Sequence, residues 1–196
     1  MKRKTLLSLS LALVALAGHV AAQQAVNPRA EVLSRFQKRI DAYLELRSKA
    51  LSGVKKLEET RNPEEVTARQ RALAEAIKTA RPGAKAGEIF FPDVAALITQ
   101  AVSADLKRRP ASERAAAVTS VPRSPRVDVN DAYPSSIPLA TVPPRLLGQL
   151  PRLPEELEYR FVGNRLILRD VDANLVVDFI DNALPRAQGP IQEKLR

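Results

Sequence analysis

The 196-residue sequence has no cysteine, no tryptophan and a single histidine, His19. The missing cysteines exclude disulfide bonds and thiolate metal ligands, so packing alone must stabilise the fold. His19 lies in an N-terminal segment that we expect to be removed. The remaining chain then has no imidazole either, which excludes Ser–His–Asp and Cys–His catalysis and any zinc or copper site built on histidine or cysteine.

The N-terminus has the layout of a secretory signal peptide. Lys2, Arg3 and Lys4 form a basic start, an apolar run covers residues 6–17, and the small residues Val20 and Ala22 precede the expected cleavage point. The apolar run is shorter than the roughly 20 residues that a membrane span requires. We therefore expect residues 1–22 to be cleaved and the mature protein to be periplasmic or secreted.

Basic side chains outnumber acidic ones, 31 to 22, and the excess is unevenly distributed. Residues 28–120 contain 18 basic and 12 acidic side chains, whereas residues 155–196 contain 6 and 8. Such an excess is typical of a soluble surface, and it would also attract an acidic protein or anionic envelope material. Nucleic acid is not expected as a partner, because aromatic side chains are not interleaved with the basic ones. The candidate partner-binding residues lie off the apolar faces of the first two predicted helices: Lys38, Arg39, Lys55, Lys56, Arg69 and Arg71.

The first half of the mature chain is helical in pattern. Apolar residues recur every three or four positions over residues 30–60 and again over 66–80, with Arg47 the one polar interruption of the first stripe. Asn62 and Pro63 are typical of a helix start, and the short connection predicts that the two helices pair as an antiparallel hairpin. A third helix is expected over 92–109 and a short fourth one over 111–120.

Eight prolines within residues 121–154 exclude a regular helix or a central strand over most of that segment. The segment is either a free linker or an extended strap that packs on the helices. Free linkers contain few large apolar residues. A strap is therefore favoured here by the following residues: Ile137, Leu139, Val142, Leu146, Leu147, Leu150 and Leu153. The expected organisation is a helical region over 23–120, this proline-rich segment, and a C-terminal part over 155–196 that packs with the helical region as one domain.

Residues 159–168 have the pattern of a β-hairpin. Apolar and polar residues alternate on both sides of Gly163 and Asn164, which supply a turn. Two strands alone are marginally stable, so the hairpin should pack on the helices or gain another strand.

Two structures compete for residues 171–184. Their apolar positions fit one face of a helix, with Asp170 or Asp172 as its N-cap and with Asp178 and Asp181 facing water. The alternative is a third strand, LVVDFI, because valine and phenylalanine suit strands. With the helix favoured, the expected fold is mainly α (α+β): a long helical hairpin, further helices, the strap, a small β-hairpin and a terminal helix.

The stretch DVDANLVVDFID at 170–181 also has the oxygen spacing of a calcium-binding loop, supplied by Asp170, Asp172, Asn174, Asp178 and Asp181. Such a loop requires glycine at its sixth position and a bidentate glutamate at its twelfth, where this chain has Leu175 and Asp181. We therefore expect no metal or other cofactor, and weak calcium binding is the less favoured alternative.

Glu88 and Asp93 are a candidate pair of catalytic carboxylates. Glu88 and Asp93 flank Phe90 and Phe91, and carboxylate pairs hydrolyse glycosides. The chain has no tryptophan and few other aromatics with which to build a cleft that stacks on a sugar. Asp93 is also explained as a first-turn residue of the third helix. No catalytic residue is expected, and a carboxylate-dependent hydrolase is the alternative function.

Two segments, GEIFFPDV at 87–94 and LPEELEYRFVGNRLILRDVDANLVVDFIDNALP at 153–185, resemble a group of uncharacterised exported proteins of Gram-negative bacteria. The resemblance covers the mature chain and implies export and a single domain, with no activity, ligand or site attached. The function expected is the non-catalytic binding of another cell-envelope component, either a protein or an anionic surface.

Overall fold

The computed structural model describes residues 27–56, 58, 62–114, 126–134 and 142–184. The predicted signal peptide, the end of the predicted fourth helix, Ile137 and Leu139 of the strap, and residues 185–196 lie outside these ranges. The fold is α+β, because helices over residues 28–114 are followed by a three-stranded antiparallel sheet. No helix in the described part of the chain is long and apolar enough to cross a membrane.

The two predicted N-terminal helices are present and contact each other: α1 (Pro28–Ser52) and α2 (Pro63–Ala80). The Asn62 side-chain oxygen accepts a hydrogen bond from the Glu64 N–H (2.9 Å), and Pro63 occupies the first turn of α2, as the sequence predicts.

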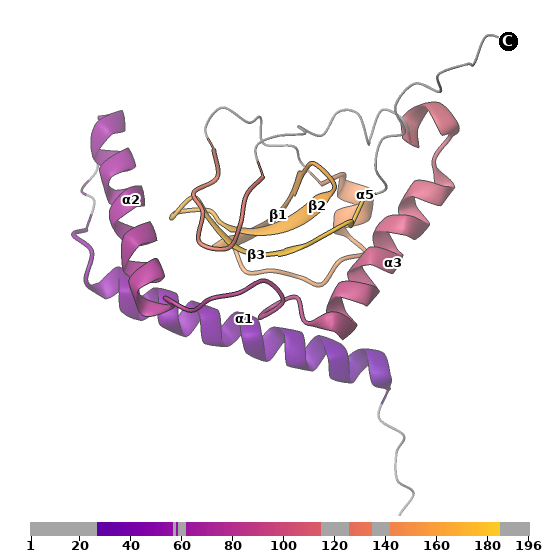
Figure 1. Cartoon of the computed structure of the whole chain (residues 1–196), viewed down its shortest axis with the longest axis horizontal. Coiled ribbons are helices and arrows are strands. Elements are labelled where there is room, and N and C mark those ends of the chain that lie inside the picture. The colour runs from indigo at the N-terminus through magenta and orange to yellow at the C-terminus, as the bar shows by residue number, and fades with distance from the viewer. Residues whose placement is uncertain (1–26, 57, 59–61, 115–125, 135–141, 185–196) are drawn as a thin grey trace, which may run out of the picture.

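The angle between these helices differs from the expectation of a long hairpin. Figure 1 shows α2 standing steeply on α1 instead of lying along it. Only the second half of α2 therefore reaches the core, through Leu73, Ala74 and Ile77. Val66, near the start of α2 and part of the predicted apolar stripe, is 47% exposed.

The third helix, α3 (Pro92–Arg108), lies where the sequence predicts it. It begins directly after the buried pair Phe90 and Phe91, and Pro92 fills the first turn, where a missing N–H costs nothing. Residues 111–114 form a single helical turn, and the rest of the predicted fourth helix lies outside the described residues.

The sheet has the order β1 (Leu157–Val162), β2 (Arg165–Asp170), β3 (Leu175–Ile180). The predicted hairpin is confirmed. Gly163, with φ of 59°, takes the first central position of the two-residue turn between β1 and β2, where type II′ turns favour glycine.

The prediction of a helix over 171–184, with Asp170 or Asp172 as its cap, is wrong, and the alternative strand is observed. β3 is buried on both faces: Leu175 and Val177 pack in the main core, whereas Val176 packs in a second cluster on the opposite side of the sheet. A strand covered on both faces has no polar alternation, so its apolar run resembles a buried helix in sequence.

The proline-rich segment packs on the protein wherever the structure describes it. Val142, Leu146 and Leu150 are buried in the same cluster as the helices and strands, and the short helix α5 (Pro144–Leu147) contacts α3. Leu147 departs from the expectation of docking, because it is 49% exposed. Residues 127–133 cover the other face of the sheet.

The sheet lies above α1 in Figure 1, with α2 and α3 on either side of it. The ring of Phe90 lies between Phe36 of α1 and Tyr159 of β1, with 6.2 Å between centroids in each pair. These stacked rings join α1, the loop before α3 and the sheet in one core.

We predict that trypsin cuts slowly after Arg145 and Arg152 in the native protein. Both side chains are exposed, but the backbone between them is fixed by the buried Leu146 and Leu150 and cannot extend into a protease. Timed digestion followed by mass spectrometry checks this. Rapid cleavage at these bonds, with both fragments still folded, would show a free linker instead.

Candidate functional site

Asp170, at the end of β2, belongs to a buried ion pair that joins the sheet to α1. Its carboxylate accepts hydrogen bonds from Arg47 Nε (2.8 Å), the Tyr43 hydroxyl (2.9 Å) and the Ala173 N–H (2.9 Å). Asp170 is 0% exposed and Arg47 only 6% exposed. Burial, reinforced by the Asp170 charge, raises the pKa of Tyr43 far above its usual range, so the Tyr43 hydroxyl remains a donor.

Asp178, in β3, is also buried, contrary to the prediction that it faces water. Its carboxylate accepts hydrogen bonds from the N–H groups of Gly87 (2.8 Å), Ile89 (2.7 Å) and Phe90 (2.8 Å). Gly87 has a φ of 87°, a conformation that favours glycine, so the loop before α3 wraps around this carboxylate. Burial raises the pKa of Asp178, and the N–H donors, which favour the charged form, oppose that rise.

The remaining members of the calcium-like spacing also bind arginines. Asp172 is a second partner of Arg47, Asn174 Oδ1 accepts from Arg169 Nε (2.9 Å), and Asp181 Oδ1 accepts from Arg165 Nε (2.6 Å). Asp170 and Asp172 thus share Arg47, and the other three oxygen-bearing residues of the stretch each have different partners. No three acidic side chains converge on a metal site within the described ranges.

The two carboxylates of the hydrolase alternative have partners of their own. Glu88 forms an ion pair with Arg81 (3.1 Å) and accepts a hydrogen bond from the Lys85 N–H (2.9 Å). Asp93 forms an ion pair with Arg35. Both carboxylates are thus accounted for by the structure of the loop and of the helix start.

The six basic candidates do not gather into one patch. Arg39 donates to the Glu88 carbonyl, and its guanidinium lies 4.7 Å from the Phe91 ring centroid, so it holds the loop before α3. Lys38 and Arg71 are exposed on α1 and α2. The other three line a single groove: Lys55, Lys56 and Arg69.

We call this site the α1–α2 groove. It has a volume of about 670 Å³ and lies between the segment that follows α1 and one face of α2. The apolar residues that line it have small side chains. Ala68, Ala72 and Ala76 recur every four residues along α2, and Val54 lies beyond the end of α1. The alanine repeat is a sequence signal that could have indicated this groove. It marks a face of α2 distinct from the face that Leu73 and Ile77 turn to the core.

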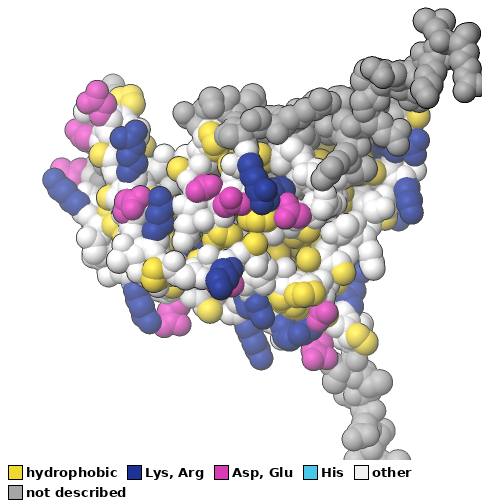
Figure 2. Space-filling view, viewed as in Figure 1, with side chains coloured by type: hydrophobic (Ala, Val, Ile, Leu, Met, Phe, Trp, Pro, Cys, Tyr) yellow, Lys and Arg dark blue, Asp and Glu magenta, His cyan; other side chains and the backbone are white. Residues whose placement is uncertain are grey.

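The groove has mixed charge and one unsatisfied donor. Glu58 and Glu65 line it together with the three cations. The Nε atom of Arg69 is buried and has no hydrogen-bond partner in the part of the chain that the structure describes. Leaving a buried donor unpaired costs roughly 1–3 kcal/mol, and a bound carboxylate would supply the missing acceptor. Figure 2 likewise shows basic and acidic side chains interspersed over the α2 arm.

Comparisons of the chain with protein-family models, curated proteins and solved structures each found no match.

Proposed function

We propose that this chain is a non-catalytic exported protein that binds an acidic segment of another cell-envelope protein in the α1–α2 groove. Export is supported by the signal-peptide pattern of residues 1–22 and by the resemblance of residues 87–94 and 153–185 to exported proteins. The observation that carries the proposal is the buried, unpaired Nε of Arg69 beside an alanine-lined surface and two exposed lysines.

The shape and charge of the groove favour a protein segment over an anionic surface. A flat surface would meet cations on a convex face, whereas Arg69 lines a concavity and is half-buried. Glu58 and Glu65 would repel a uniformly anionic surface but would pair with basic residues of a mixed segment. The small alanine side chains allow apolar residues of that segment to approach α2 closely, as in other helix grooves that bind peptides.

Charge reversal inside the groove should weaken binding much more than reversal elsewhere. We expect Lys55→Glu combined with Lys56→Glu to weaken binding of a fluorescent, net-acidic peptide of glutamate, leucine and a few lysines at least about tenfold, which corresponds to about 1.4 kcal/mol. The matched control, Lys38→Glu with Arg71→Glu, changes the net charge equally at exposed positions outside the groove and should have a far smaller effect. Fluorescence anisotropy of the labelled peptide measures both.

Salt and a second probe complete the test. Raising the salt from 0.1 to 1 M shortens the Debye length from about 10 to about 3 Å and should weaken wild-type binding. An equal loss in the two double variants would show that net charge, and not the groove, governs binding. Binding to anionic lipid vesicles without binding to the peptide would show an anionic surface as the partner.

A further inference from the structure

The β1 strand has an unpaired edge. Val162 pairs with Arg165 across the two-residue turn, and the Val171 N–H donates to the Glu156 carbonyl (2.9 Å). The even-numbered residues of β1 therefore exchange hydrogen bonds with β2. The N–H and C=O groups of Tyr159 and Phe161 therefore point away from β2. Within the described ranges, no hydrogen bond reaches these groups.

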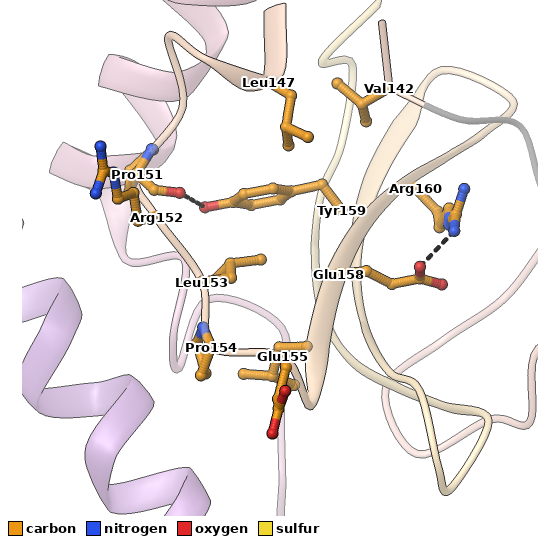
Figure 3. A pocket seen from close by; sticks show the side chains of 11 residues that line it. Val142, Leu147, Pro151, Arg152, Leu153, Pro154, Glu155, Glu158, Tyr159 and Arg160 are labelled. Carbon is orange, nitrogen blue, oxygen red and sulfur yellow. Dashed lines mark hydrogen bonds and ion pairs between the residues drawn. The ribbon is translucent and has the colours of Figure 1, made fainter. Parts of the chain in front are cut away.

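Open space follows this edge. A groove of about 510 Å³ lies between β1 and the strap, and Figure 3 shows Tyr159 reaching into it between Leu147 and Leu153. The Tyr159 hydroxyl donates to the Pro151 carbonyl (3.0 Å), which fixes the strap as the wall of this groove on the core-facing side of β1. Leu147, at this groove, is one of two exposed large apolar side chains in the described part of the chain. Exposed apolar surface beside an unpaired strand edge is typical of an interaction site.

The charges of Glu158 and Arg160 on β1, which form an ion pair within one chain, are also self-complementary between two copies. Glu158 and Arg160 lie on either side of Tyr159 and point to the face of the sheet opposite the main core (Figure 3). In an antiparallel pair of β1 strands centred on Tyr159, Glu158 of each copy lies opposite Arg160 of the other. Opposite charges at facing positions stabilise strand pairs, whereas like charges destabilise them. The Nε atom of Arg160 is also buried without a hydrogen-bond partner among the described residues.

We propose that β1 pairs with the β1 strand of a second copy of this chain, in antiparallel register centred on Tyr159. The two Tyr159 residues exchange main-chain hydrogen bonds, and each Phe161 N–H donates to the Leu157 carbonyl of the other copy. The two sheets become one continuous sheet across a two-fold axis, which closes the free edge of both copies.

Charge exchange tests the register directly. Light scattering of the purified mature protein over a wide concentration range should show a dimer in equilibrium with monomer. Glu158→Arg and Arg160→Glu should each weaken the dimer at least about tenfold, because each places like charges opposite one another. An equimolar mixture of the two variants should form a heterodimer, since every Arg then faces a Glu. Glu75→Arg, an exposed change on α2, is the control and should leave the dimer intact.

Three results would overturn the proposal. The wild-type protein could remain monomeric at the highest concentration, the two single variants could dimerise as the wild type does, or their mixture could remain monomeric while both are folded by circular dichroism. Glu158→Gln, which adds no positive charge beside Arg169, is the milder second variant, and a dimer as strong as that of the wild type would count against the proposal as well.

Discussion

Replacing Asp170 with alanine should lower the free energy of unfolding by about 3–5 kcal/mol, because Arg47 would be left charged and buried without its main partner. Tyr43 and the Ala173 N–H would also lose their acceptor. A loss of this size lowers the melting temperature of a domain of this length by roughly 6–20 °C. Urea denaturation followed by circular dichroism at pH 7 measures the change.

The matched control for this variant is Asp172→Ala. Asp172 also forms an ion pair with Arg47, but its side chain is 54% exposed. Ion pairs of exposed groups contribute at most about 1 kcal/mol, so this variant should be destabilised only slightly. Equal losses of stability in the two variants would contradict the conclusion that Asp170 is the main buried partner of Arg47.

Replacing Asp178 with alanine should destabilise the protein by at least about 3 kcal/mol, because several buried N–H groups would lose their acceptor at roughly 1–3 kcal/mol each. The affected groups belong to Gly87, Ile89 and Phe90, in the loop that leads into α3. Asp178→Asn retains one acceptor oxygen but turns an amide NH₂ toward backbone donors, so it should be intermediate.

Hydrogen exchange distinguishes a local role for Asp178 from a general loss of stability. In Asp178→Ala the amides of Ile89 and Phe90 should lose more protection than those of the β1–β2 ladder. The control, Asp181→Ala, removes an exposed acid three residues further on and should leave both sets nearly unchanged. Uniform loss of protection across the sheet would contradict the view that the Asp178 hydrogen bonds stabilise this loop specifically.

The helices could be predicted from sequence because their signals are local. Caps, first-turn prolines and three-to-four spacing placed α2 and α3 almost to the residue. The first helix was less well placed, because α1 ends at Ser52, before the end of the predicted range 30–60. The steep crossing of α2 over α1 could not be predicted in this way, because it depends on where the sheet and strap fill space. The α1–α2 groove follows from that crossing, so the sequence could supply its charged residues but not their convergence.

Buried charge was the main error of the sequence interpretation. Arg47 interrupts an apolar stripe, and Asp178 lies inside an apolar run. The local pattern indicates only an interrupted stripe for Arg47 and a solvated acid for Asp178, although a charged residue at a core-facing position requires a buried partner. The partners, Asp170 for Arg47 and backbone N–H groups for Asp178, are far away in sequence, and pattern analysis along the chain does not identify such pairs.

The buried ion pair also bears on the proposed binding site. Arg47 lies near the C-terminal end of α1, and the chain continues from there through Val54, Lys55 and Lys56 into the groove. Because Asp170 holds this end of α1 against the sheet, it also fixes one wall of the α1–α2 groove. The sheet thus positions the α1–α2 groove, to which it contributes no side chain.

The most direct test of this architecture is a double-mutant cycle on Arg47 and Asp170. Arg47→Met, Asp170→Asn and the double variant are compared by urea denaturation under one set of conditions. If α1 is held to the sheet by this pair, the double variant should be more stable than the sum of the single losses predicts, by about 1–3 kcal/mol. Additive losses, with a coupling free energy near zero, would contradict a buried ion pair between α1 and the sheet.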